Sequence, residues 1–185
     1  KANGAVSSDH AHADLDTSPL PHDEAGRLYR KARAGQITVT EGDALRKTML
    51  FEMARMASED GLVMTLHPAV ARNHHQATFD RFGADVGGDI PVAFEAVESL
   101  RPMLNAFGTH PNFRVILFGQ DETVYSREVG PLAGFYPSVY VGPPWWFIDA
   151  PDAIMRWRQS VTEYGTFYKT TGFVDDTRAF MSIPA

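Results

Sequence analysis

The run Gly61-Leu62-Val63-Met64-Thr65-Leu66, which His67 follows directly, indicates the fold class of this 185-residue chain, because it is short, apolar and opened by a glycine. Four further runs of this kind occur, at residues 5–8, 113–118, 138–141 and 172–174. Gly, Pro, Asn or Asp bounds most of them, as is typical of buried parallel strands. We therefore predict five strands.

Helical patterns of apolar residues separate the predicted strands. The predicted helices cover residues 23–35, 40–61, 93–107 and 122–134, and a last one begins at Pro151. The second helix opens with Thr40-Glu41-Gly42-Asp43, which resembles a capping box. Pro102 lies inside the third helix, so we expect a kink or break near residues 99–101, because proline lacks a backbone donor and clashes with the preceding turn.

This alternation predicts βα units in a parallel sheet, since each connection is long enough for a right-handed crossover helix. Two α/β architectures have this order of elements, a doubly wound open sheet and a part of a (β/α) barrel. The residues indicate no internal domain boundary. In both architectures the functional groups collect at the carboxyl ends of the strands.

Composition argues against several classes of function. The net charge is −6 without a basic stripe, so nucleic acid is not an expected partner. The absence of cysteine excludes disulfides, thiolate zinc sites and a cysteine nucleophile. No apolar run approaches the ~20 residues that span a bilayer, so no membrane partner is expected.

The absence of two motifs and the identity of the first residue further limit the classes of protein to which the chain could belong. No glycine-rich turn follows the first predicted strand and no Gly-x-Ser-x-Gly motif occurs, which argues against a nucleotide binder and a serine hydrolase. The chain starts with Lys1 rather than Met, and no apolar segment follows as in a signal sequence. We therefore expect an internal piece of a longer protein.

Polar or aromatic side chains follow the predicted strands where each strand ends. They are Asp9-His10, His67 with Arg72-Asn73-His74-His75, Gln120-Asp121-Glu122, Trp145-Trp146 and Asp175-Asp176-Thr177-Arg178. His67 is either a hydrogen-bonded structural histidine or a ligand. Arg72 offers a planar fork that fits a carboxylate, and Asn73 can bind a hydroxyl group.

Each of three motifs at these strand ends has both a functional and a structural interpretation. Asp175-Asp176 fits either a metal ligand with its support or a helix cap, and Trp145-Trp146 fits either a rigid pocket wall or the core. His10-Ala11-His12 has the spacing of half a metal site on a strand. Because this pair lies beyond the apolar run, we expect it in a loop and not as a metal site by itself.

Five stretches taken in order resemble the uronate (glucuronate) isomerases of the amidohydrolase superfamily. They are Ser8-Asp9-His10, residues 62–67, Arg72-Asn73-His74, residues 143–147 and residues 175–180. The resemblance implies a metal-dependent (β/α)₈ barrel, of which residues 1–185 would form the C-terminal portion. The five strands would be the fourth to eighth barrel strands, with a helical insert at about residues 16–60. The family's first-strand His-x-His pair and the tyrosine after it would lie upstream of Lys1, and a basic segment would lie beyond Ala185.

The resemblance also implies roles for individual residues. Asp176 matches the family's metal-ligating carboxylate and proton carrier, and Arg178 matches an active-site arginine. Arg72 resembles the arginine that binds the substrate's carboxylate, while His67 contacts either metal or substrate. Trp145 and Trp146 match a tryptophan pair near the sugar. The expected cofactor is a divalent metal, zinc, whose other ligands would lie upstream of Lys1.

The implied activity is aldose–ketose isomerisation of uronates, such as D-glucuronate to D-fructuronate and D-galacturonate to D-tagaturonate, through an enediol. The resemblance further implies a cytoplasmic homo-oligomer whose partner is the sugar acid. Two alternatives stay open. One is a hydrolase of the same superfamily that attacks with metal-bound hydroxide. The other is a non-catalytic flavodoxin-like binding domain with strand order 2-1-3-4-5.

Overall fold

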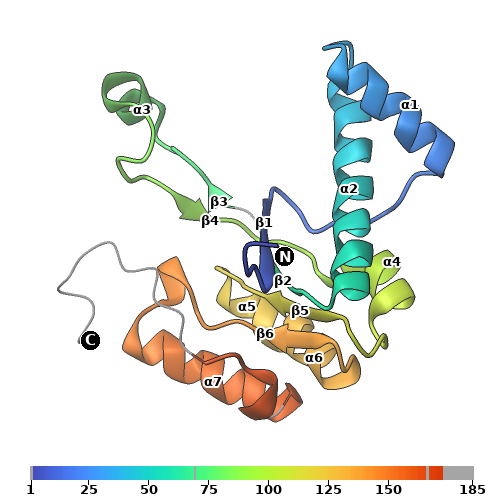
Figure 1. The fold of residues 1–185 in the computed structure, drawn as a ribbon. Helices are drawn as coiled ribbons and strands as arrows, with labels where there is room; N and C mark the ends of the chain where they lie inside the picture. The colour runs from blue at the N-terminus through green and yellow to red at the C-terminus, as the bar shows by residue number, and fades with distance from the viewer. Residues whose placement is uncertain (1, 69, 166, 173–185) are drawn as a thin grey trace.

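The computed structural model describes residues 2–68, 70–165 and 167–172, and its centre is a four-stranded parallel sheet (Figure 1). The sheet consists of β1 (Ser7–His12), β2 (Val63–Pro68), β5 (Arg114–Leu117) and β6 (Val139–Val141), in that spatial order. A parallel bridge from Val141 to Thr170 continues the order beyond β6. The strands of this sheet thus follow one another in space as they do in sequence. This order contradicts the flavodoxin-like alternative, in which the first strand lies between the second and the third.

The two faces of the sheet differ because side chains alternate along each strand. In β2, Met64 and Leu66 are fully buried, whereas Val63, Thr65 and His67 are only partly buried. The buried face joins the hydrophobic core with residues of the surrounding helices, such as Leu50 and Leu100. The register places Asp9 beside Thr65 and Thr65 beside Ile116, so a row of partly exposed side chains crosses the other face.

The connections contain the helices α1 (His22–Arg33), α2 (Val39–Asp60), α4 (Val97–Phe107), α6 (Gly130–Phe135) and α7 (Pro151–Gly165). Figure 1 shows α1 and α2 side by side, extending away from the sheet, and α6 and α7 packed together next to β6. Between β5 and α6 the chain forms α5 (Glu122–Val124) and the π-helical turn η1 (Tyr125–Val129), which confirms a helical segment over 122–134. Two 3₁₀ turns, η2 (Trp146–Ile148) and η3 (Phe167–Lys169), flank α7.

A projecting segment between β2 and α4, which we call the arm (residues 70–91), was not predicted. It consists of the antiparallel pair β3 (Val70–Ala71) and β4 (Ile90–Pro91), with α3 (Gln76–Phe82) between them. In Figure 1 the arm extends away from the sheet, separate from the α1–α2 pair. Strands of two residues carry too short a pattern to be found from sequence.

The predicted bounds of two helices are corrected. The capping box of α2 is formed by Thr38 and Glu41 rather than by Thr40 and Asp43, and Gly61 ends the helix at φ 68° as expected. The third helix begins at Val97 and not at Ala93, because the Glu95 carboxylate accepts hydrogen bonds from the backbone N–H groups of Glu98 and Ser99.

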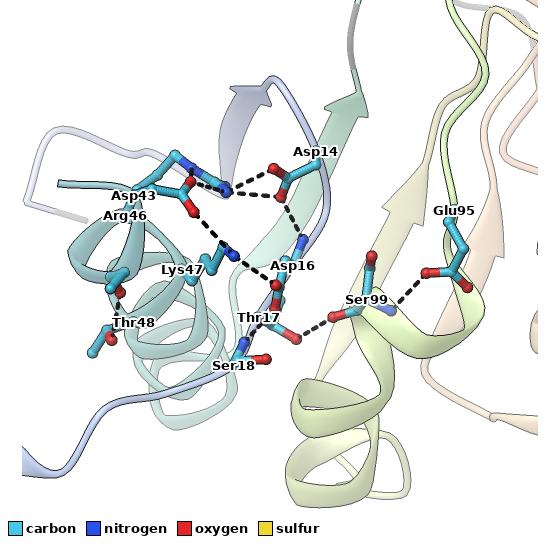
Figure 2. Close-up of polar contacts among 11 residues, drawn as sticks. Asp14, Asp16, Thr17, Ser18, Asp43, Arg46, Lys47, Thr48, Glu95 and Ser99 are labelled. Atoms are coloured by element: carbon cyan, nitrogen blue, oxygen red, sulfur yellow. Dashed lines mark hydrogen bonds and ion pairs between the residues drawn. The ribbon is translucent and has the colours of Figure 1, made fainter. Parts of the chain in front are cut away.

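Pro102 perturbs α4 without breaking it. The helix runs from Val97 to Phe107 through Pro102. The Ser99 carbonyl accepts hydrogen bonds from the backbone N–H and the hydroxyl of Thr17, whose contact with Ser99 is drawn in Figure 2. The Thr17 hydroxyl in turn accepts from the Met103 N–H. A buried threonine from the segment after β1 is therefore inserted at the turn that proline weakens.

The segment after β1 is also tied to α2 by ion pairs. Figure 2 shows Arg46 bound to Asp14 and Lys47 bound to Asp16. The Arg46 Nη2 lies 2.8 and 2.9 Å from the two carboxylate oxygens of Asp14, and the Lys47 Nζ lies 2.9 Å from Asp16 Oδ2. Single exposed pairs contribute little, but several that share one segment restrict its conformation. Together with Thr17 they fix the chain directly behind the end of β1.

The first strand lies later than predicted, at Ser7–His12 instead of residues 5–8. His10 and His12 are therefore strand residues, and their expected place in a loop was wrong. Ser7–His12 is polar, and the strand is defined by its pairing with Val63–Pro68 rather than by an apolar run. The predicted strand over 172–174 lies, apart from residue 172, outside the described residues. Within the described part of the chain, no helix is both long and apolar enough to cross a membrane.

Candidate active site

A pocket of about 260 Å³, the site pocket, opens where the parallel strands end. Its lining residues come from four connections of the sheet and are Ala11, His12, Ala13, His67, Pro68, Val70, Arg72, Gln120 and Trp145. The carboxyl ends of parallel strands meet at one edge, which explains how residues more than 130 positions apart share one cavity. Three of the seven predicted site residues, His67, Arg72 and Trp145, are brought together here.

His67 lies between two aromatic rings at the end of β2. Its ring centroid is 4.5 Å from that of Phe118 and 4.5 Å from that of Trp145. The Asp9 carboxylate approaches its Nδ1 to 3.4 Å. Burial lowers the pKa of His67, and the nearby Asp9 charge opposes this shift. The imidazole is therefore neutral at pH 7, the form that binds metals or exchanges hydrogen bonds with a substrate.

Arg72 reaches the site pocket from the turn that follows β3. Its Nη1 lies 3.3 Å from Asp89 and 3.7 Å from Asp85, two carboxylates of the same arm. The other oxygen of Asp89 accepts the backbone N–H of Asn73 at 2.9 Å. Asn73 has a φ of 52°, a left-handed conformation that asparagine tolerates better than most residues. Asp89 thus holds both the guanidinium and the turn that carries it.

Of the other four predicted residues, only Asn73 has a side chain that the structure describes. Asn73 is held through its backbone and is absent from the lining. Trp146 begins η2, and nothing is described of its side chain. Asp176 and Arg178 lie outside the described residues, so their predicted roles stay predictions. Trp145 forms a pocket wall against His67, the first of its two interpretations.

His12 and Gln120 also line the site pocket. The sequence placed both near strand ends, but neither was among the predicted site residues. Burial lowers the pKa of His12, and the charges of Arg46 and His10 lower it further. The charge of Asp14 acts in the opposite direction and raises this pKa. Gln120 is only 5% exposed and follows β5 by three residues. The position of Gln120 after an apolar run was a usable signal, but nothing in the sequence indicates that its side chain is buried.

Metal binding is not completed by the described residues. Among residues 2–68, 70–165 and 167–172, no group of three or more His, Asp or Glu side chains could hold a metal ion. His67 and Asp9 are two donors at most, whereas a catalytic zinc site needs three protein ligands. The described donors alone therefore do not complete a metal site.

A parallel sheet of consecutively ordered strands, with a polar and aromatic pocket at their carboxyl ends, defines the class of α/β enzymes to which barrel domains belong. A family model described as glucuronate isomerase matches residues 1–185. The chain belongs to this glucuronate isomerase family.

Similar proteins agree with this assignment. The chain is 54% identical over 185 residues to the uronate isomerase of Cutibacterium acnes. The matched region covers 100% of this chain and 39% of that protein. The chain is 50% identical to the uronate isomerase of Brucella canis, covering 100% of the chain and 40% of that protein. The chain thus spans about two fifths of the length of these relatives.

Two solved structures share the fold. The glucuronate isomerase of Caulobacter crescentus superposes with a TM-score of 0.91 at 48% identity, over 99% of this chain and 38% of that one. The uronate isomerase of Thermotoga maritima gives a TM-score of 0.87 at 29% identity, over 98% of this chain and 40% of that one.

Proposed function

We propose that this chain contributes part of the active site of a uronate isomerase, which interconverts D-glucuronate with D-fructuronate and D-galacturonate with D-tagaturonate. The observation that carries the proposal is the site pocket, where Arg72, His67 and Trp145 meet at the carboxyl edge of the sheet in a chain of this family. A polar carboxylate-binding group beside an aromatic wall suits a sugar acid.

In this proposal the strands from β1 to the segment at Thr170 are the fourth to eighth strands of a (β/α)₈ barrel, and residues 16–60 form a helical insert. The partly exposed row on the sheet, with Asp9, Thr65 and Ile116, would face the barrel interior. Other parts of a longer polypeptide would close the barrel. The family resemblance further implies a homo-oligomeric, cytoplasmic enzyme.

Substrate binding is assigned to the described residues of the site pocket. The Arg72 guanidinium binds the carboxylate of the uronate, because a planar fork matches two carboxylate oxygens. Trp145 provides an apolar wall for a face of the carbon chain, and neutral His67 exchanges a hydrogen bond with an oxygen of the sugar. Two roles rest on the family resemblance and the residue type rather than on the pocket lining: Asn73 would bind a hydroxyl group, and Trp146 would pair with Trp145 near the sugar.

Proton transfer is assigned to Asp176. Its carboxylate removes the proton from C2 of the open-chain aldose, and the C2 hydroxyl proton moves to the former carbonyl oxygen, which yields the cis-enediolate, the deprotonated form of the enediol. Return of the carried proton to C1 gives the ketose. Arg178 stabilises the negative charge that develops on the oxygens. A divalent metal, zinc in our proposal, held by Asp176 and by ligands outside this chain, would supply Lewis-acid stabilisation of that charge.

The test is a direct assay of the complete polypeptide. It is incubated with D-glucuronate and Zn²⁺, and the ¹H NMR spectrum is followed for signals of the ketose. We expect D-fructuronate to accumulate to a constant aldose–ketose ratio. Unchanged D-glucuronate after long incubation, in a folded and metal-loaded sample, would contradict the proposal and favour the hydrolase alternative.

A further inference from the structure

Gln120 is a buried amide whose carbonyl oxygen has no donor among the residues that the structure describes. The residue is 5% exposed, and its Oε1 accepts no hydrogen bond from any described part of the chain. Buried polar side chains in folded proteins nearly always have a partner. An acceptor without one, in the wall of a cavity, indicates that the donor arrives with the molecule that fills the cavity.

The buried amide belongs to a residue that lines the site. Gln120 lines the site pocket together with His67, Arg72 and Trp145. It also lines a second cavity of about 480 Å³ that extends toward Val92 and Phe147. The side chain therefore forms part of the wall shared by the two cavities.

The backbone around Gln120 is held on both sides. The hydroxyl of Tyr125 accepts the Gly119 N–H at 2.8 Å and donates to the Gly119 carbonyl at 3.0 Å. On the other side, the Asp121 carboxylate accepts the Thr123 N–H at 2.9 Å and caps α5. An amide on such a fixed backbone meets its ligand without losing much conformational freedom.

We propose that Gln120 is a specificity-determining residue whose Oε1 accepts a hydrogen bond from one hydroxyl group of the sugar acid, at C3, C4 or C5. The proposal rests on the proposed function and adds a discrimination that the carboxylate-binding Arg72 does not supply. A neutral acceptor suits an alcohol O–H, because it forms the hydrogen bond without attracting a cation. A site built around such a hydrogen bond rejects the analogue that lacks the hydroxyl, since the buried acceptor then stays unpaired.

The experiment compares the complete wild-type enzyme with Gln120→Met, which keeps the length of the side chain and removes the acceptor. The measured quantity is kcat/KM for D-glucuronate and for its 3-, 4- and 5-deoxy analogues. Gln36→Met, at an exposed glutamine beyond α1, is the matched control. Thermal unfolding of each variant reports its folded state.

We expect Gln120→Met to lower kcat/KM for D-glucuronate by roughly 10- to 100-fold, and Gln36→Met to leave it unchanged. For one deoxy analogue, wild type and Gln120→Met should have equal kcat/KM, because the partner hydroxyl is already absent. An equal loss for every substrate, or no loss at all, would overturn the proposal.

Wild-type measurements alone decide the matter if Gln120→Met does not fold. If the wild-type kcat/KM values for D-glucuronate and all three deoxy analogues lie within a factor of three of one another, the enzyme does not recognise any of these hydroxyl groups. Gln120 is then not a specificity-determining residue. A wild-type enzyme that does not isomerise D-glucuronate would instead refute the proposed function. The two failures are thus distinct.

Discussion

The hydroxyl group of Tyr125 forms two hydrogen bonds with the backbone of Gly119, one with its N–H at 2.8 Å and one with its carbonyl at 3.0 Å. Tyr125 is 1% exposed and lies in the π-helical turn η1, six residues after the glycine. Burial raises the pKa of the Tyr125 hydroxyl, so it remains protonated and able to donate at every physiological pH. The turn between β5 and the site pocket is fixed by this side chain.

Tyr125→Phe should destabilise the protein by about 1–3 kcal/mol, because two buried backbone groups of Gly119 lose their partner. Urea denaturation of the complete protein measures the loss. Tyr168→Phe, at a tyrosine that is 87% exposed, is the matched control and should change stability little. Equal stabilities of the two variants would contradict the role of the Tyr125 hydroxyl.

Asp89→Asn should raise KM for uronates several-fold with a smaller change in kcat. The substitution weakens the ion pair that holds Arg72 and the hydrogen bond to the Asn73 N–H, so the guanidinium is less well positioned for the carboxylate. Asp85→Asn is the control, since Asp85 is 3.7 Å from Arg72 and its side chain is 78% exposed. Steady-state kinetics on D-glucuronate separates the two constants.

Arg72→Met should raise KM far more than Asp89→Asn does, while the free energy of unfolding changes little. The methionine keeps an unbranched chain but cannot pair with a carboxylate. Since Arg72 is 54% exposed, its charge contributes little to folding. An unchanged KM in Arg72→Met would remove this residue from substrate binding, whatever Asp89→Asn does.

Stability should fall as pH drops below about 6.5, the ordinary pKa of histidine. Burial lowers the pKa values of His10, His12 and His67 in the folded state. As pH falls, the unfolded chain therefore binds protons before the folded chain does, and the equilibrium shifts toward unfolding. Above pH 7 the three imidazoles are neutral in both states and the effect vanishes.

Urea denaturation at pH 5.5 and pH 7.5 measures this loss in the complete protein. His67→Gln should reduce the difference in stability between the two pH values, because one buried titrating group is removed. His74→Gln replaces an exposed imidazole and serves as the control. A difference that is the same in wild type and His67→Gln would show that His67 does not contribute.

Asp176→Asn should lower kcat for isomerisation by at least about 100-fold and leave the fold intact, because an amide cannot carry the proton from C2 to C1. Circular dichroism checks the fold, and Asp149→Asn, at an exposed carboxylate, controls for the loss of one charge. Near-normal turnover in Asp176→Asn would exclude this residue from the mechanism.

Local patterns in the sequence were sufficient for most elements of the sheet and its helices. The apolar run ending at Leu66 and the left-handed Gly61 before it define the start of β2, and both signals lie within a few residues of each other. Elements with weak local patterns were missed or misplaced. The polar strand β1 exists because it pairs with β2, 56 residues further along, and β3 and β4 are too short for any periodicity.

The sequence by itself determined that strands and helices alternate, that strand-end positions such as His67 and Arg72 are polar, and that the chain resembles one family of isomerases. Hydrophobic periodicity and capping act between near neighbours, so they can be recognised without coordinates. Only the tertiary structure decided that His67 lies between Phe118 and Trp145 and that Asp89 holds Arg72. It also decided that the buried Gln120 oxygen meets no donor within the described ranges. Burial and pairing depend on residues far apart in the chain, and only the folded arrangement brings these together.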